Sequence, residues 1–306
     1  MSIDVLQAKI RKLKTPIVVG LDPTPELIPA AILEECFASL GPGPAAMAEA
    51  YTRFCTGLLE ALKKTVPAVK VQTACFEALG WHGVQSMQTV LDCAKKLGYY
   101  VLLETMRSDV GHIAELTARS AFGELRFGDE SYTPYPCDGV VLLGYLGSDG
   151  IRPYLPCLKG EDRKNVFVVV KSSNRSSAEV QDLVSGTRVV YTAMADLALR
   201  WSTDLFGSCG YGEVGAVVSG LAPSAVRELR RRYDTLFFLV PGYGAQGGVA
   251  KHAGYAFDRL GHGAAVCASR SVIGAWQQEG AGDYREAAQT AVEKMKKQLE
   301  TYVTVL

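Results

Sequence analysis

The chain alternates between short, continuously apolar runs and longer segments in which apolar residues recur every three to four positions. The short runs are rich in β-branched residues and most are bounded by turn formers. This is typical of strands that are covered on both faces in a parallel sheet. We predict eight such strands, at residues 15–23, 69–72, 100–104, 139–143, 166–170, 215–218, 236–240 and 264–267.

Helical patterns separate these strands. A short amphipathic segment at 5–13 comes first, and we predict helices at 45–64, 83–97, 110–121, 189–205, 224–232 and 284–302. Eight alternating units fit a (β/α)8 TIM barrel better than an open doubly wound sheet, which usually has fewer strands. The length alone would permit two domains. We interpret the polar or Gly/Pro-rich connections at 41–44, 127–136 and 144–160 as loop insertions, and therefore predict one barrel domain over residues 1–306.

Charge and composition narrow the class of partner. The 32 basic and 32 acidic residues cancel, and without a long run of like charge the sequence carries no electrostatic footprint for nucleic acid or an anionic membrane. No apolar run approaches the ~20 residues of a membrane span, and the first residues lack the layout of a signal peptide. We expect a cytoplasmic protein that binds a small molecule or a second copy of itself.

The eight cysteines and four histidines are scattered along the chain, without a Cys-x-x-Cys pair. In a chain of this length without a secretion signal, such cysteines are typical of reduced, buried thiols. We assign the cysteines and histidines to no disulfide, no metal site and no cofactor.

The candidate site begins where an apolar strand ends in charged residues. In the strand at 100–104 alternate side chains share a face, so Glu104 and Met106 lie on one side while Arg107 points the other way. The carboxyl ends of barrel strands are where active sites are built. Other polar residues fall in or after the predicted strands: Asp22, Lys70 and Ser172 to Asn174. Taken singly these are weak signals, since Asp before Pro is a common turn former.

Two segments near the C-terminus are more specific. Residues 241–248 read Pro-Gly-Tyr-Gly-Ala-Gln-Gly-Gly after the seventh strand, and Ser269-Arg270-Ser271 follows the eighth. Glycines such as Gly247 let backbone N–H groups crowd an anion, and Gln246 offers an amide. Arg270 offers a planar guanidinium. Loops after strands seven and eight form the common phosphate site of TIM barrels, so we predict a phosphate site here, with a tight turn plus a surface arginine as the alternative.

Together these segments resemble the orotidine 5′-phosphate decarboxylase family, in particular its longer bacterial branch. The likeness runs through most of the chain, over residues 19–23, 69–77, 241–248 and 269–270, and the Pro-Gly-x-Gly-Ala-Gln-Gly-Gly match is the most specific piece. The resemblance implies a TIM barrel and a homodimer with active sites at the shared interface. It also implies the metal-free loss of CO2 from orotidine monophosphate to give UMP in pyrimidine biosynthesis.

The resemblance also implies a role for each matching position. Asp22 and Lys70 would bind the ribose hydroxyls, with Lys70 also part of the charged catalytic network. Ser173 would contact the pyrimidine, while Gln246 and Arg270 would hold the phosphate. The substrate-binding residues predicted in this way are Asp22, Ser173, Gln246, Gly247, Ser269 and Arg270.

The residues after the third strand depart from the family pattern. Family members carry Asp-x-Lys-x-x-Asp: an Asp near the substrate carboxylate, a Lys that protonates C6 as CO2 leaves, and an Asp that reaches into the partner's site. Here the same spacing places Glu104, Met106 and Asp109. A thioether has no proton to give, and positioned acid catalysis is typically worth about 10²–10⁴ in rate. The predicted catalytic positions are therefore Lys70, Glu104, Met106 and Asp109.

Neighbouring positions differ as well. Ile113 stands where the family tends to place Thr, Arg175 where Pro is expected after Ser-Asn, and Leu143-Gly144-Tyr145 where Asn-Pro-Tyr is usual. Several differences in one pocket, beside unchanged phosphate-binding segments, favour a site whose ligand or reaction has changed.

Without a lysine between them, Glu104 and Asp109 would face each other in a partly dry pocket, where one should take up a proton or attract a cation. Lys70 is a partial substitute for that cation. A divalent metal held by Glu104 and Asp109, as in metal-dependent sugar-phosphate decarboxylases with this barrel, is an alternative. Two functions therefore stay open: a decarboxylase of this family, and a catalytically silent homologue that binds UMP or another phosphorylated ligand.

Overall fold

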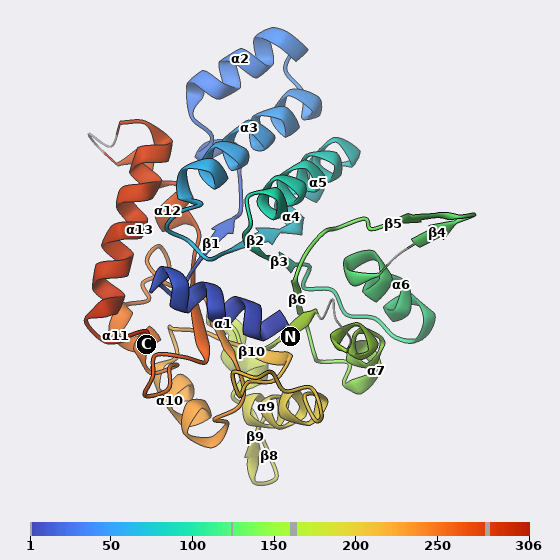
Figure 1. Ribbon diagram of the computed structural model, residues 1–306, viewed down its shortest axis with the longest axis vertical. Coiled ribbons are helices and arrows are strands. Elements are labelled where there is room, and N and C mark those ends of the chain that lie inside the picture. Colours follow the sequence, from blue (N-terminus) through green and yellow to red (C-terminus); the bar gives the residue numbers. More distant parts are fainter. Residues whose placement is uncertain (1, 124, 160–163, 279–281) are drawn as a thin grey trace.

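A closed barrel of eight parallel strands forms the centre of the molecule. The computed structural model describes residues 2–123, 125–159, 164–278 and 282–306. Around the barrel the strand order is β1-β12-β11-β10-β7-β6-β3-β2, with helices outside (Figure 1). The predicted TIM barrel is confirmed. Its strands are β1 (Ile17–Leu21), β2 (Ala68–Gln72), β3 (Tyr100–Glu104), β6 (Gly139–Leu142), β7 (Asn165–Lys171), β10 (Val214–Val218), β11 (Phe238–Val240) and β12 (Ala264–Ala268).

The longer helices follow the predicted pattern, with short helical turns between them. The α-helices are α1 (Ser2–Leu13), α2 (Ala30–Leu40), α3 (Pro44–Leu62), α4 (Thr73–Glu77), α5 (Trp81–Lys96), α6 (Gly111–Phe122), α7 (Ser148–Ile151), α8 (Ala178–Gln181), α9 (Val190–Trp201), α10 (Pro223–Arg232), α11 (Ala250–Gly254), α12 (Arg270–Ile273) and α13 (Tyr284–Glu300). The 3-10 turns are η1 (Pro25–Leu27), η2 (Arg152–Leu158), η3 (Arg175–Ser177) and η4 (Ala275–Gln277). None of the helices in the described ranges is long and apolar enough to cross a membrane.

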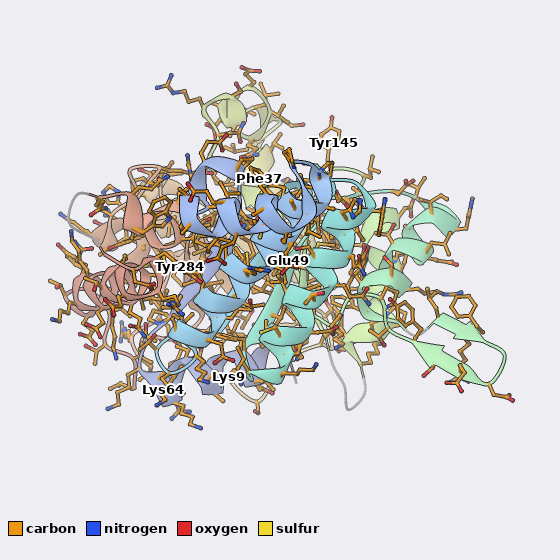
Figure 2. The ribbon with its side chains drawn as sticks, turned by 90° about the horizontal axis from the view of Figure 1, so that it is seen from above. Lys9, Phe37, Glu49, Lys64, Tyr145 and Tyr284 are labelled. Carbon is orange, nitrogen blue, oxygen red and sulfur yellow. The ribbon has the colours of Figure 1, made fainter. Side chains whose placement is uncertain are left out.

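The connections interpreted as loop insertions contain more structure than predicted. The segment at 127–136 overlaps a hairpin of β4 (Leu125–Phe127) and β5 (Glu130–Tyr132), which extends away from the body in Figure 2. The segment at 144–160 contains α7 and η2, and its last residue, Gly160, lies outside the described residues. A second hairpin, β8 (Val184–Ser185) and β9 (Arg188–Val189), follows α8. Helix α2, which the sequence pattern did not predict, packs beside α3.

Strand alternation divides the core into two layers. In β3, Tyr100 and Leu102 point into the barrel, whereas Val101 and Leu103 point outward against the helices. Helix α1 lies across one end of the barrel (Figure 1) and buries apolar side chains against the interior layer. The hydroxyl of Ser2 in α1 lies 2.7 Å from that of Tyr100. Because α1 closes the amino end of the strands, the open mouth is at their carboxyl end.

Candidate active site

A cavity of about 300 Å³ opens at the carboxyl ends of the barrel strands. It brings together eight of the ten residues that the sequence proposed as a site: Asp22, Lys70, Glu104, Met106, Ser173, Gln246, Ser269 and Arg270. Asp109 and Gly247 are not among its lining residues. The volume lies at the lower end of the range found for small-molecule sites.

Lys70 is the centre of a charged network on one wall of this cavity. Its Nζ donates to Asp22 Oδ1 at 2.8 Å and to Glu104 Oε2. Gln72 Nε2 donates to the same Glu104 oxygen at 2.9 Å. Burial alone would lower the pKa of the Lys70 amine, but the negative charges of Asp22 and Glu104 outweigh it and hold this pKa above its ordinary value. Lys70 is therefore held as an ammonium, and it offsets one of the two carboxylate charges that it contacts.

Strand register explains how these groups meet. Lys70 pairs with Gly20 of β1 on one side and with Leu102 of β3 on the other, and Gln72 pairs with Glu104. A Cβ at Gly20 would lie 2.8 Å from the Cβ of Ser269 and 3.2 Å from the Cε of Lys70. The glycine therefore leaves the space in which Lys70 and Ser269 stand side by side.

The expectation that Glu104 and Asp109 face each other without a cation is wrong for the single chain. Glu104 is paired with Lys70, whereas Asp109 is exposed and its Oδ1 accepts from the Val110 N–H at 2.8 Å. The predicted metal alternative needed these two carboxylates together. Among the described residues, no group of three or more His, Cys, Asp or Glu side chains is placed to hold a metal ion.

Met106 lines the cavity through a turn rather than through continued strand alternation. β3 ends at Glu104, and Met106 has a φ of 50°, in the left-handed region. Its N–H donates to the carbonyl of Val141 at 3.2 Å. A non-glycine residue in this conformation costs roughly 1–2 kcal/mol. Arg107 does not line the cavity and pairs with Glu77, so its predicted direction holds although the strand has already ended.

The other end of the cavity is formed by the glycine loop (residues 241–248) and the start of α12. We expected the loop glycines to offer N–H groups to an anion, but those of Gly244, Gly247 and Gly248 donate to carbonyls within the loop itself. The groups that line the cavity here are side chains: the Gln246 amide, the Arg270 guanidinium and the Ser269 hydroxyl. Ser269 Oγ is buried without a hydrogen-bond partner among the described residues. An orphaned buried donor beside a guanidinium favours an anionic ligand.

Among the other lining residues, sequence reasoning did not single out Gln72, Cys267 or Tyr243. Gln72 could have been found, because it is two positions from Lys70 on one strand and so shares its face. Cys267 stands two positions before Ser269 in the same way, and burial raises the pKa of its thiol to about 12, which keeps it neutral. Tyr243 gave no signal. Its hydroxyl donates to Gln298 Oε1 in α13, a contact between segments far apart in the sequence.

The geometry suits one class of ligand. An ammonium held between carboxylates can hydrogen-bond neutral hydroxyl groups, and a serine, an amide and a guanidinium can hold an anion at the other end. Ser172 and Ser173 line the cavity after β7 and add two more hydroxyls. A molecule with a hydroxylated body and a phosphate matches both ends.

Comparisons with known proteins agree with this geometry. Residues 15–284 match the Orotidine 5'-phosphate decarboxylase / HUMPS family. An orotidine 5′-phosphate decarboxylase of Rhodopirellula baltica is 32% identical over 303 residues, covering 96% of this chain and 97% of that protein. An orotidine 5′-phosphate decarboxylase of Clostridium novyi is 30% identical, covering 97% of this chain and 98% of that protein. The solved Leishmania donovani OMP decarboxylase superposes with a TM-score of 0.73 at 26% identity, covering 98% of this chain and 99% of that one.

Proposed function

This chain belongs to the orotidine 5′-phosphate decarboxylase / HUMPS family, and from that premise we propose that it binds a pyrimidine nucleoside monophosphate such as UMP. We further propose that it does not decarboxylate orotidine monophosphate at an ordinary enzymatic rate. The phosphate would be held by Ser269, Gln246 and Arg270. The ribose hydroxyls would lie against Asp22 and Lys70, and the base would lie near Ser173.

The proposal that decarboxylation is absent or slow rests on the side chain at position 106. Met106 lines the cavity where the family pattern calls for the lysine that protonates the carbon losing CO2. Among the described residues that line the cavity, the cationic side chains are Lys70 and Arg270. Arg270 stands at the phosphate end, after β12. An acid that protonates this carbon is therefore missing unless Lys70 supplies it.

Lys70 is poorly suited to that task. Its amine is engaged by both Asp22 and Glu104, and these carboxylates raise its pKa. A general acid works best when its pKa is near the operating pH, and a raised pKa makes the amine a weaker acid. Transferring its proton would also leave two partly buried carboxylates without a counter-charge.

The second candidate is an active decarboxylase in which Lys70 donates the proton. Two observations favour it: relatives named orotidine 5′-phosphate decarboxylase align over nearly the whole chain, and Lys70 is an ammonium inside the cavity. In that case Glu104 would stand near the substrate carboxylate, as the first Asp of the family pattern does.

Two measurements separate these functions. Calorimetric titration with UMP should show saturable binding, whereas uridine should bind much more weakly because it lacks the phosphate. Incubation with orotidine monophosphate, followed by the ultraviolet change on CO2 loss, should show little turnover at high protein concentration. Turnover of ordinary enzymatic size that disappears in Lys70→Ala would overturn the silent function and establish the second candidate. Absence of UMP binding, together with absence of turnover, would reject both proposals for the pocket.

We also propose a homodimer, on the strength of the family. Asp109 is exposed in the single chain and contributes nothing to its own cavity, which is what a residue that completes a partner's site requires. Sedimentation equilibrium at micromolar concentration should give twice the chain mass. A monomer at concentrations where UMP binds at full affinity would contradict this assembly.

A further inference from the structure

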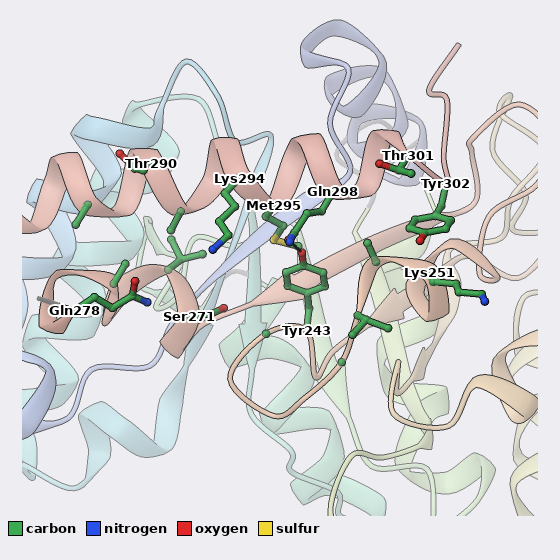
Figure 3. Close-up of a pocket in the computed structure, with 18 residues that line it drawn as sticks. Tyr243, Lys251, Ser271, Gln278, Thr290, Lys294, Met295, Gln298, Thr301 and Tyr302 are labelled. Carbon is green, nitrogen blue, oxygen red and sulfur yellow. Dashed lines mark hydrogen bonds between the residues drawn. The ribbon is translucent and has the colours of Figure 1, made fainter. Parts of the chain in front are cut away.

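A second and larger cavity lies on the outer side of the glycine loop. It has a volume of about 920 Å³ and runs between α13 on one side and α11 and α12 on the other (Figure 3). Its size is within the range of small-molecule sites. We call it the outer groove.

The charged side chains that line the outer groove are basic. Among the described residues that line it there are two lysines, Lys251 and Lys294, and no aspartate or glutamate. Its hydroxyl groups come from Tyr243, Ser271, Thr290, Thr301 and Tyr302. Alanines, Val272 and Met295 provide apolar surface between these polar groups. A groove with this lining favours an elongated ligand that has an apolar body and an acidic group.

Ser271 and Lys294 line the groove without a partner among the described residues. Ser271 Oγ is buried and makes no hydrogen bond in the part of the chain that the structure describes. Lys294 extends from α13 toward the side of the groove formed by α12 (Figure 3), and within the described ranges no ion pair involves it. Buried hydroxyls are normally hydrogen-bonded, so an unsatisfied hydroxyl beside a free ammonium indicates the place of the ligand's acidic group.

The outer groove adjoins the 300 Å³ cavity at the carboxyl ends of the strands, which we call the nucleotide cavity. Tyr243 lines both cavities, and its hydroxyl donates to Gln298 of α13. Gly244 has a φ of 74°, and a Cβ there would lie 2.6 Å from Ser271 Oγ, so the loop rests directly on Ser271. Ser271 in turn follows Arg270, which lines the nucleotide cavity. A ligand packed against Tyr243 and Ser271 would hold the glycine loop in place from its outer side.

We propose that the outer groove is a second small-molecule site, for an elongated acidic ligand with an apolar body, and that its occupancy tightens nucleotide binding through Tyr243. The coupling rests on the proposed nucleotide site. The groove site stands independently of it, because its own lining and its own unsatisfied donors define it.

The probe for the groove is 1-anilinonaphthalene-8-sulfonate, which combines an aromatic body with one sulfonate. Fluorescence titration of the wild-type chain should give saturable binding at one site. Lys294→Ala should weaken it about tenfold, Lys294→Arg should retain it, and Ala291→Phe should block it by filling the groove. Lys297→Ala is the matched control, since Lys297 is exposed on the same helix and does not line the groove. Equal affinity in wild type, Lys294→Ala and Ala291→Phe would overturn the site.

The coupling is tested by titrating UMP into protein saturated with the probe. UMP should bind at least about fivefold more tightly, and saturating UMP should tighten the probe by the same factor, because coupling between binding sites is reciprocal. Tyr243→Phe, which removes the contact with Gln298, should reduce this factor. An unchanged UMP affinity would reject the coupling and leave the groove assignment standing. If UMP fails to bind in the absence of probe, the proposed function fails, and the probe titrations still decide the groove.

Discussion

Lys70 and Glu104 form an ion pair between neighbouring parallel strands, and Gln72 donates to the same carboxylate oxygen. Glu104, which stands at the position of the first Asp in the family pattern, is thus paired with a lysine of the next strand. Among the described residues that line the cavity, no second lysine accompanies Lys70. The roles of Met106 and Lys70 can therefore be tested separately.

Met106→Lys should restore an amine to the cavity. Because residue 106 already lines the cavity, the new ammonium has access to the ligand without a change of fold. Decarboxylation of orotidine monophosphate should rise by a factor of about 10² or more, which is the lower end of what positioned acid catalysis supplies. The measurement is the ultraviolet change in single-turnover mixtures.

The matched control is Met106→Gln, which is polar and of similar length but offers no ammonium, and it should show no gain. If Met106→Lys binds UMP as the wild type does and still shows no gain, the cavity is not complementary to the transition state. The changes at positions such as Leu143 and Arg175 would then have redirected the site.

Lys70→Met should destabilise the fold, because it leaves Asp22 and Glu104 without their shared cation. Lys70 is 7% exposed and Glu104 12%, and breaking a buried pair typically costs about 3–5 kcal/mol. Since Asp22 is 26% exposed, we expect the lower end, about 3 kcal/mol in urea unfolding. Lys63→Met is the control, because its pair with Glu60 is exposed at the C-terminal end of α3 and should contribute less than about 1 kcal/mol.

Adding Glu104→Gln to Lys70→Met should recover part of the lost stability, since it removes one of the two uncompensated charges. A double variant no more stable than Lys70→Met would mean that the network is held together by packing rather than by charge.

Arg270→Ala should weaken UMP binding by about 1.5–3 kcal/mol, the contribution of a charge-assisted hydrogen bond. Uridine binding should be unaffected, because uridine has no phosphate for the guanidinium to hold. Arg259→Ala is the control, since Arg259 is exposed and does not line the cavity. Equal losses for UMP and uridine would show that Arg270 supports the cavity wall and is not a phosphate ligand.

The barrel was predictable because its strands are continuously apolar and alternate with helical patterns. The two hairpins were not predicted, although each carries a turn signal. Gly128-Asp129 and Gly186-Thr187 are two-residue turns whose glycines have φ values of 64° and 62°, which fits a tight hairpin connection. Their strands have only two or three residues, too few for alternation to be recognised. Helix α2 was missed because little of it is buried.

For the site, eight of the ten predicted residues line the cavity, and they lie on strands, after strand ends or in the glycine loop. Lys70 and Glu104 are on strands, where period-two alternation sets the direction of a side chain. Asp109 lies in the connection between β3 and α6, where no periodicity applies, and its exposure was not foreseen. The glycine loop was predicted to be a phosphate segment, but which of its N–H groups bond internally depends on its φ angles. Neither the outer groove nor the Tyr243 contact with Gln298 leaves a local sequence signal.

Glu213 should make stability fall with rising pH. It is fully buried beneath α1, where Oε2 accepts from the Ile3 N–H at 3.1 Å and Oε1 has no partner in the described residues. Burial raises its pKa to about 7, above the value of about 4.3 in an unfolded chain. Between these values the folded state holds a proton that the unfolded state has lost. The stability that protonated Glu213 contributes to the folded state is therefore fully present below about pH 4 and is lost as the pH rises to about 7.

Glu213→Gln removes this titration, so its stability relative to wild type should increase by about 2–3 kcal/mol between pH 5 and pH 8. Urea unfolding at several pH values measures that difference, and other titrating groups cancel in the comparison. Glu293→Gln is the control, because Glu293 is exposed on α13 and its substitution should leave the pH dependence unchanged. Parallel curves for wild type and Glu213→Gln would mean that Glu213 is ionised in the folded protein at pH 5, with α1 held over the barrel by its charged form.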